Sequence, residues 1–215
     1  MEFVSQCINL FHQGGPVMYV IAGCSLAVVT IAVERYIYFR QMSTDTQLFI
    51  NKLQPLLERK KIGEAQQLCE DTPAVIGRLA AEGLEAYQKE SNIEVVMEGA
   101  AALSAARLRE YLNYLSFIVT LSPLLGLLGT VIGMINSFSV FNVKNGQPMA
   151  ITGGIGEALV ATATGLMVAI MALAAHTYFT HRLDQLVTDM EQVYTLIMTR
   201  LAGNKRARRE NHEIA

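Results

Sequence analysis

Charged side chains are almost absent from a long part of this sequence. Between Tyr111 and His181 the only formal charges belong to Lys144 and Glu157. Lys144 lies among turn-forming residues at 142–148, so it divides the uncharged stretch into two apolar arms. A carboxylate such as that of Glu157 costs about 2.5 to 3.5 kcal/mol to place at the centre of a bilayer, so it is seldom accidental there. The stretch predicts two membrane helices, one of which carries an ionisable group.

Several motifs of enzyme chemistry are also missing. The sequence has no Ser-His-Asp set, no glycine-rich phosphate loop and no cluster of metal-ligating residues, so we predict neither an enzyme nor a bound metal or cofactor. No basic segment precedes an apolar core near the N-terminus, which argues against a cleavable signal peptide. The 17 basic and 19 acidic residues nearly balance, and nothing in their arrangement suggests nucleic acid as a partner.

Three apolar blocks account for the 52% hydrophobic content of the chain. Each block is longer than the roughly 18 residues that cross a bilayer as a helix. We therefore predict an all-α membrane protein with three transmembrane helices over residues 16–39, 113–141 and 149–180. A turn over 142–148 joins the last two helices.

The basic residues are distributed unevenly around these spans. Residues 1–15 contain none and the 142–148 turn contains only Lys144, whereas the other 16 of the 17 lie at or beyond the opposite ends of the spans. The positive-inside rule then places the N-terminus on the outer side of the membrane. The same rule places residues 40–112 and the C-terminal region 181–215 in the cytoplasm.

The two ends of the chain carry further signals. Apolar residues recur with helical spacing over residues 2–13, so we predict that residues 1–15 form an amphipathic helix on the outer interface of this membrane, which is periplasmic if the family resemblance given below holds. The basic tail Lys205–Arg209 is expected to contact lipid headgroups on the cytoplasmic side. The three cysteines cannot pair within one chain, because each lies in a different compartment. Cys7 is expected on the outer side, Cys24 within the membrane and Cys69 on the cytoplasmic side.

Both cytoplasmic regions have a helical pattern and are predicted to extend the membrane helices inwards. Between residues 40 and 112 we predict three short helices, at about 46–60, 63–70 and 74–89, followed by one long helix. Ser91 and Glu94 form a capping-box pattern, so the long helix is predicted to start near Ser91 and to run straight into the second span. The third span is predicted to continue past Arg182 with an apolar stripe, made of Leu186, Met190, Val193 and Ile197. This stripe can pack within the subunit or against another subunit.

Three polar residues are predicted to lie deep in the apolar arms. Counting along the helices at 1.5 Å per residue places Glu157 about 13 Å, Thr130 about 16 Å and Thr162 about 21 Å from their outer ends. All three then fall in the middle half of a hydrocarbon core about 30 Å thick. Thr162 is about 140° away from Glu157 around the helix, so it can point towards the second helix instead of sharing a lumen with the carboxylate. Each residue also has a structural alternative, because a membrane glutamate can lock helices together and a threonine often bonds a carbonyl of its own helix.

Small residues indicate where the second and third spans pack. Ala161 and Gly165 follow Glu157 at intervals of four residues, which places a ridge of small side chains below the carboxylate. The second span offers three glycines of its own: Gly126, Gly129 and Gly133. Such ridges let membrane helices approach closely, so these five small residues are predicted to form a helix-packing seam.

Two segments of the sequence resemble a known family. The run Pro123–Met134 of the second span and the run Gly154–Leu166 of the third are similar to those of the MotA/TolQ/ExbB proton-channel family, closest to its ExbB/TolQ branch. The resemblance implies a pentameric stator subunit in the bacterial inner membrane that uses the proton-motive force to energise envelope processes such as TonB-dependent import. The implied partners are a dimer of a single-span protein of the ExbD/TolR kind and a TonB- or TolA-like protein. In the family, residues matching Thr130, Glu157 and Thr162 are polar lumen residues around the partner's membrane aspartate.

The sequence departs from the family at one position and leaves two other functions open. Met171 follows Ala169-Ile170 where the family often has proline, which predicts a straighter third helix. A non-conducting membrane scaffold that stabilises a single-span partner is the main alternative function. A solute transporter is the weaker alternative, because the three spans show no internal repeat and no broken-helix site.

Overall fold

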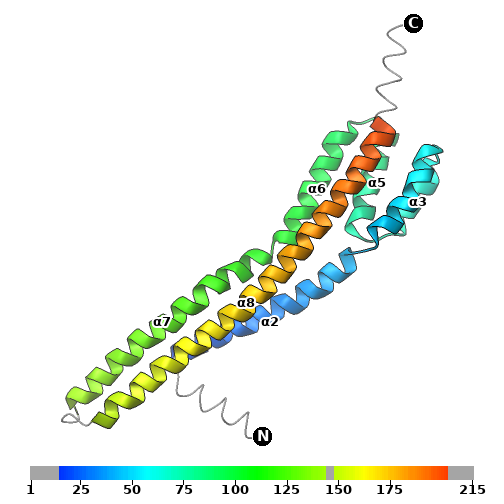
Figure 1. The fold of residues 1–215 in the computed structure, drawn as a ribbon. Coiled ribbons are helices and arrows are strands. Elements are labelled where there is room, and N and C mark those ends of the chain that lie inside the picture. The colour runs from blue at the N-terminus through cyan, green and yellow to red at the C-terminus, as the bar shows by residue number, and fades with distance from the viewer. Residues whose placement is uncertain (1–14, 144–147, 203–215) are drawn as a thin grey trace. The chain divides into compact units, whose positions relative to one another are not determined.

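The computed structural model describes residues 15–143 and 148–202 of the chain. Every regular element in these residues is a helix, which confirms the all-α prediction (Figure 1). The elements in chain order are α2 (Val17–Met42), α3 (Thr46–Glu58), α4 (Ile62–Glu70), α5 (Val75–Gln88), α6 (Ile93–Arg109), α7 (Leu112–Val143), α8 (Pro148–Ile197) and the π-helical turn η1 (Met198–Ala202). The predicted periplasmic helix, residues 144–147 of the turn and the basic tail lie outside the described residues.

Three helical stretches are long and apolar enough to cross a membrane. They are Val17–Glu58, Ile93–Ser139 and Gly153–Leu201, and each overlaps most of one of the predicted spans. The third span belongs to α8, a single α-helix of 50 residues. Its only proline stands at the first position, where a missing N–H costs nothing.

The chain divides into two compact units. The apolar unit consists of the residues up to Glu34 together with Tyr111–Tyr178, and the polar unit consists of Arg35–Glu110 and the residues from Phe179 onward. Helices α2 and α8 each contribute residues to both units. Each unit has its own packing, and we describe the two in turn.

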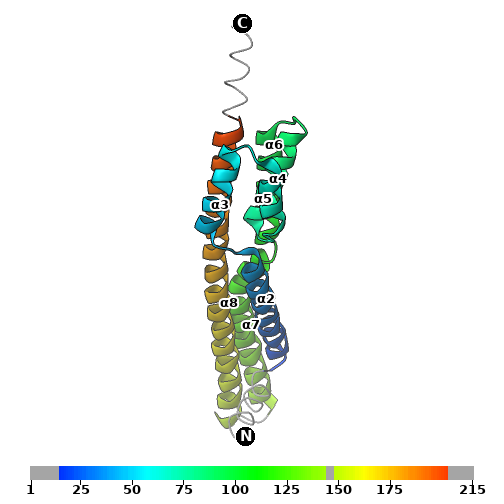
Figure 2. The ribbon, with the colours of Figure 1, turned by 90° about the vertical axis from the view of Figure 1, so that its right-hand side faces the viewer.

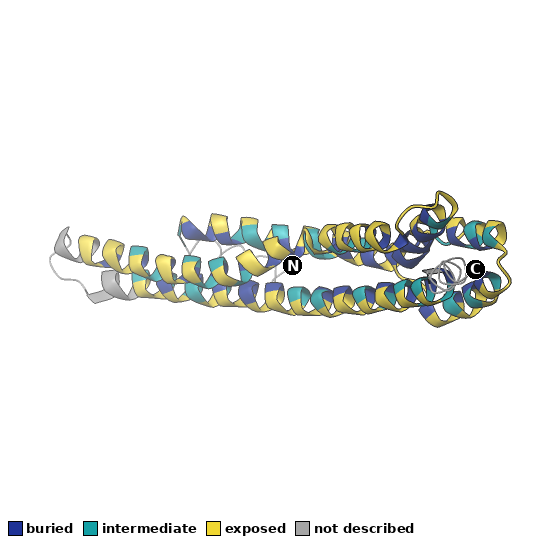
Figure 3. Cartoon of the chain, turned by 90° about the horizontal axis from the view of Figure 1, so that it is seen from above, coloured by how far each residue is buried: buried dark blue, intermediate teal, exposed yellow. Residues whose placement is uncertain are grey.

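In the apolar unit, α7 and α8 run antiparallel and side by side, with the first part of α2 beside them (Figures 1 and 2). Its outer faces are exposed, as the yellow stripes in Figure 3 show, and many of the exposed residues there are large and apolar. Leu26 of α2, Leu124 of α7 and Leu159 of α8 are all exposed, at 70%, 62% and 63%. A surface this apolar requires lipid or protein to cover it, which agrees with a membrane location.

In the polar unit, short amphipathic helices pack around the C-terminal part of α8. The predicted short helices are confirmed to within two residues as α3, α4 and α5. All four residues of the predicted apolar stripe on α8 are buried within this chain: Leu186, Met190, Val193 and Ile197. Of the two alternatives left open by the sequence, packing within the subunit is therefore the one that the structure shows. An ion pair of 3.0 Å between Arg200 and Glu58 joins η1 to α3.

The long helix starts near Ser91 as predicted, with α6 beginning at Ile93, but its cap differs from the predicted one. The side chain of Asn92, and not that of Ser91, accepts the hydrogen bond from Glu94 N, at 3.2 Å. The helix does not run straight into the second span as predicted, because Glu110 and Tyr111 separate the end of α6 at Arg109 from the start of α7 at Leu112.

The physical cause of this interruption lies in α2. The buried guanidinium of Arg35 donates to the carbonyl oxygens of Arg107 and Leu108, at 3.4 Å each, and lies 4.7 Å from the ring centre of Tyr38. A cation that binds the last carbonyls of a helix satisfies acceptors that otherwise lack partners and interacts favourably with the helix dipole. Helix α6 can therefore end without glycine or proline.

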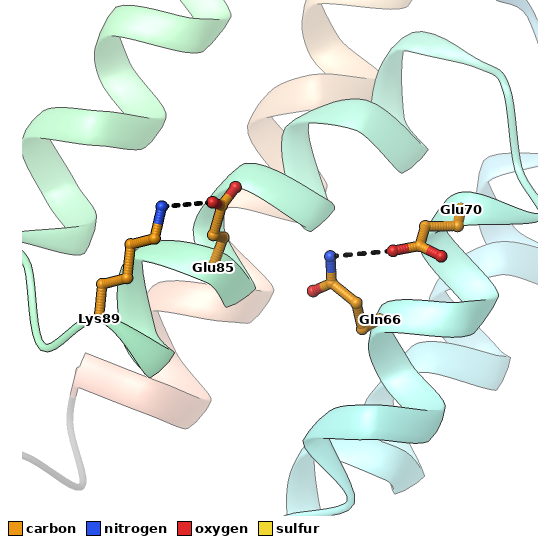
Figure 4. Close-up of polar contacts among 4 residues, drawn as sticks. All are labelled: Gln66, Glu70, Glu85 and Lys89. Atoms are coloured by element: carbon orange, nitrogen blue, oxygen red, sulfur yellow. Dashed lines mark hydrogen bonds and ion pairs between the residues drawn. The ribbon is translucent and has the colours of Figure 1, made fainter.

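Exposed polar pairs one turn apart lie on the surface of the polar unit (Figure 4). Lys89 Nζ lies 2.5 Å from Glu85 Oε1, and Gln66 Nε2 donates to Glu70 Oε1 at 3.4 Å. Such pairs contribute only about 0.2 to 0.5 kcal/mol each, so the buried apolar side chains account for most of the stability of this unit.

Helix α5 ends in a Schellman motif built on a glutamate. Glu90 has the left-handed φ of 57°, while its N–H bonds to Tyr87 O at 3.2 Å and the N–H of Ser91 bonds to Ala86 O at 2.9 Å. Glycine is the usual residue at such a position, because a Cβ disfavours the left-handed conformation. The sequence places no glycine here, so the end of α5 carries local backbone strain.

We therefore expect Glu90→Gly to raise the free energy of unfolding of the polar unit by about 1 kcal/mol, because it removes the left-handed penalty. Glu82→Gly is the matched control: Glu82 is exposed in the middle of the same helix, where glycine should destabilise by about 1 kcal/mol. Thermal unfolding in mild detergent, followed by circular dichroism, measures both changes. A decrease in stability for both variants would contradict this account of the cap.

Cys69 is buried in α4 within the polar unit. Burial, with a smaller effect from neighbouring Glu70, raises the pKa of its thiol to about 12. The thiol is therefore protonated at neutral pH and lacks the thiolate character of a reactive cysteine.

Candidate functional site

Helices α7 and α8 pack closely along a seam in the apolar unit. A Cβ at Gly129 would lie 2.6 Å from Ala161 Cβ, and a Cβ at Gly133 would lie 3.0 Å from Ala158 Cβ. A Cβ at Gly165 would lie 2.6 Å from Ser122 O on α7. Both helices therefore present residues without room for a larger side chain, and their backbones come close enough for van der Waals contact along the seam.

One hydrogen bond crosses this seam from a predicted site residue. Thr162 Oγ1 of α8 donates to Gly126 O of α7 at 2.9 Å. The close approach at Gly126, where a Cβ would lie 3.0 Å from Thr162 Cα, makes this bond possible. Thr162 thus points towards the second helix, which is the direction given by its angular separation from Glu157.

Two other threonines of these helices bond within their own helix. Thr130 Oγ1 donates to Leu127 O at 2.6 Å, and Thr164 Oγ1 donates to Val160 O at 2.8 Å. Within the described part of the chain, no hydrogen bond joins Glu157 to Thr130 or Thr162. The structure therefore places the three predicted site residues on the same pair of helices without bringing their polar groups together.

Glu157 lies at the contact between α8 and the start of α2. Its side chain is partly buried, and its Oε1 occupies the space that a Cβ at Gly15 would need, with Cδ 3.4 Å from that position. Gly15 immediately precedes Pro16 in the turn that leads into α2 and has the left-handed φ of 69°. Nothing in the spacing of the sequence indicated this contact between Gly15 and the carboxylate.

This contact also gives a second measure of the depth of Glu157. The carboxylate is level with the first residues of α2. Glu34, the last residue of the apolar part of that span, lies about 26 Å further along the helix. Helices α7 and α8 extend beyond this level, so a count along α2 places Glu157 nearer the end of the spans than a count from Pro148. Both counts leave Glu157 within the apolar part of α8.

The helices and the carboxylate together define a multi-pass membrane protein with an ionisable group in an apolar helix. No group of three or more His, Cys, Asp or Glu suited to a metal ion occurs among residues 15–143 and 148–202. Comparison with known proteins gives the family directly. Residues 71–192 match the model of the MotA/TolQ/ExbB proton channel family, and the chain belongs to this family. Its members are transport proteins and not enzymes, as the sequence predicted.

Named relatives agree with this family. The chain is 29% identical over 195 residues to a putative biopolymer transport protein ExbB homolog of Methanothermobacter thermautotrophicus, a match that covers 90% of this chain and 70% of the relative. It is 35% identical over 173 residues to the putative biopolymer transport protein ExbB-like 1 of Synechocystis sp., covering 77% and 67%. It is 30% identical over 164 residues to ExbB-like 3 of the same organism, covering 74% and 78%.

Proposed function

We propose that this chain is the stator subunit of a motor driven by the proton-motive force, which energises an envelope process such as TonB-dependent import. The observation that carries the proposal is Glu157, a carboxylate in an apolar helix at the contact of α8 with α2, within the segment matched by the family model. An ionisable group at such a position is a functional residue by default, because its insertion is costly.

The hydrogen bonds of the apolar unit support the proposal that a second protein contributes to the ion pathway. Thr130 and Thr162 already donate their hydroxyl protons to backbone carbonyls, so neither is poised to pass a proton to Glu157. One carboxylate cannot relay protons across a core about 30 Å thick. We therefore propose that five copies of this chain surround a dimer of a single-span ExbD/TolR-like protein, whose membrane aspartate carries the proton. A TonB- or TolA-like protein would receive the force.

The available energy fits this mechanism. One elementary charge that crosses 100 mV releases about 2.3 kcal/mol. This is enough to bias a step between neighbouring subunits of a ring.

Proton flux into vesicles tests the proposed function. The chain is reconstituted with and without a single-span protein of the ExbD/TolR kind, a potassium diffusion potential is applied, and an internal pH dye reports proton entry. We expect flux above that of empty vesicles only when both proteins are present. If the complex forms but its flux equals that of empty vesicles, the chain is a non-conducting scaffold.

The proposed location is the bacterial inner membrane, with the N-terminus in the periplasm, the polar unit and C-terminus in the cytoplasm, and the basic tail against lipid headgroups. A cysteine introduced at Asn145 should then react with an impermeant maleimide in intact spheroplasts. A cysteine at Lys89 or Arg208 should react only after the membrane is opened, and Lys89 is suitable because its side chain is exposed. Native cysteines are first replaced by serine or alanine. The reverse labelling pattern would overturn the topology.

A further inference from the structure

The carboxylate of Glu157, from α8, fills the space that a side chain at Gly15 would need. A Cβ at this position would collide with Glu157 Oε1. Two other glycines in the same three helices behave differently: a Cβ at Gly23 of α2 or at Gly156 of α8 would meet no described atom within 4 Å. Because position 15 has no side chain, the carboxylate of Glu157 can lie against the backbone of the turn.

The start of α2 is a favourable place for a negative charge. The helix dipole places partial positive charge at the N-terminal end of a helix. The turn is well defined, because Gly15 O accepts a hydrogen bond from Met18 N at 3.2 Å and both Val17 and Met18 are buried. The backbone against which Glu157 lies is therefore fixed in position.

All three apolar helices meet at this point. Gly15 brings α2 to α8 through Glu157, and a Cβ at Gly129 of α7 would lie 3.9 Å from Val17 of α2 and 2.6 Å from Ala161 of α8. A change in the packing of the first turn of α2 would consequently alter the surroundings of Glu157 directly.

We propose that Gly15 is a positioning residue for Glu157: by leaving space for the carboxylate, it holds that group against the start of α2 and sets its direction for ion transfer. The inference rests on the proposed role of Glu157 in proton flux and adds the residue that orients it. A side chain at position 15 displaces the carboxylate and lowers flux.

The first test measures the contact without reference to activity. Melting temperatures in mild detergent are determined for the wild type, Gly15→Ala, Glu157→Ala and the double variant. Alanine at a left-handed position is strained in any background, but only the collision depends on Glu157. We expect Gly15→Ala to lower the melting temperature strongly in the wild type and much less beside Glu157→Ala. An equal decrease in both backgrounds would show that strain alone is responsible and would overturn the proposal.

The second test measures function in the two-component vesicles. Gly15→Ala should reduce proton flux several-fold at equal amounts of assembled complex, whereas Gly23→Ala, at an open position of α2, should leave flux unchanged. A second outcome is that the effect of Gly15→Ala on the melting temperature depends on Glu157 while its proton flux stays unchanged. That result would show that the contact is only structural and would overturn the positioning role. If Glu157→Ala itself conducts normally, the proposed function fails, while the melting-temperature cycle still reports on the contact.

Discussion

Replacing Glu157 with alanine should abolish energy-dependent function and proton flux while the assembly remains intact. The substitution removes the carboxylate that lies against the start of α2, and the space that it leaves faces the glycine turn and not the α7–α8 seam. Growth of a strain that lacks the native gene, together with flux in the two-component vesicles, measures the loss. Affinity purification with the single-span partner checks that the complex still forms.

Three further substitutions make this result specific. Glu157→Gln should be milder if hydrogen bonding is the main role of the side chain. Thr130→Ala and Thr162→Ala should each reduce activity less than Glu157→Ala, because their hydroxyls bond to backbone carbonyls. Normal growth and normal flux in Glu157→Ala would instead support the scaffold function.

Replacing Gly129 with leucine should prevent α7 and α8 from packing and should thereby weaken assembly. Even a Cβ at this position would lie 2.6 Å from Ala161 Cβ, so a leucine side chain must push the helices apart. Overpacking of this kind costs about 3 kcal/mol or more when the backbone cannot yield. Mass measurement in mild detergent should then show monomer and aggregate in place of the ring expected for the wild type.

Gly23→Leu is the matched control, because position 23 of α2 is open and exposed in the described structure. This variant should assemble as the wild type does. Normal assembly of Gly129→Leu would contradict the seam geometry, and a wild-type protein that is only monomeric would contradict the proposed ring.

The parts of the fold that depend on local pattern could be predicted from the sequence. The lengths of the apolar blocks gave three candidate spans, and the apolar stripe beyond Arg182 gave a continuous α8. The interruption between α6 and α7 could not be predicted, because it depends on Arg35, which lies on another helix and binds the carbonyls of Arg107 and Leu108. No signal in the local sequence at Glu110–Tyr111 indicates a helix end.

The candidate site was predictable to a similar extent. Helical phase alone showed that Thr162 can face the second span, and its hydrogen bond to Gly126 O has that direction. The neighbour of Glu157 was not predictable, because Gly15 belongs to a different helix and a glycine before proline is most simply interpreted as a turn. Sequence spacing describes one helix at a time, whereas contacts between helices require the packed structure.

The burial of the α8 stripe within its own chain affects how a genetic screen of this protein should be interpreted. Loss-of-function alleles at Val193 or Ile197 are expected to lower the cellular amount of the protein, since both side chains are fully buried in the polar unit. Compensating mutations in a second gene should not rescue such alleles. Alleles at Val95 or Leu103 of α6, whose side chains are 62% and 55% exposed, leave the fold intact and are the better starting point for allele-specific suppressors.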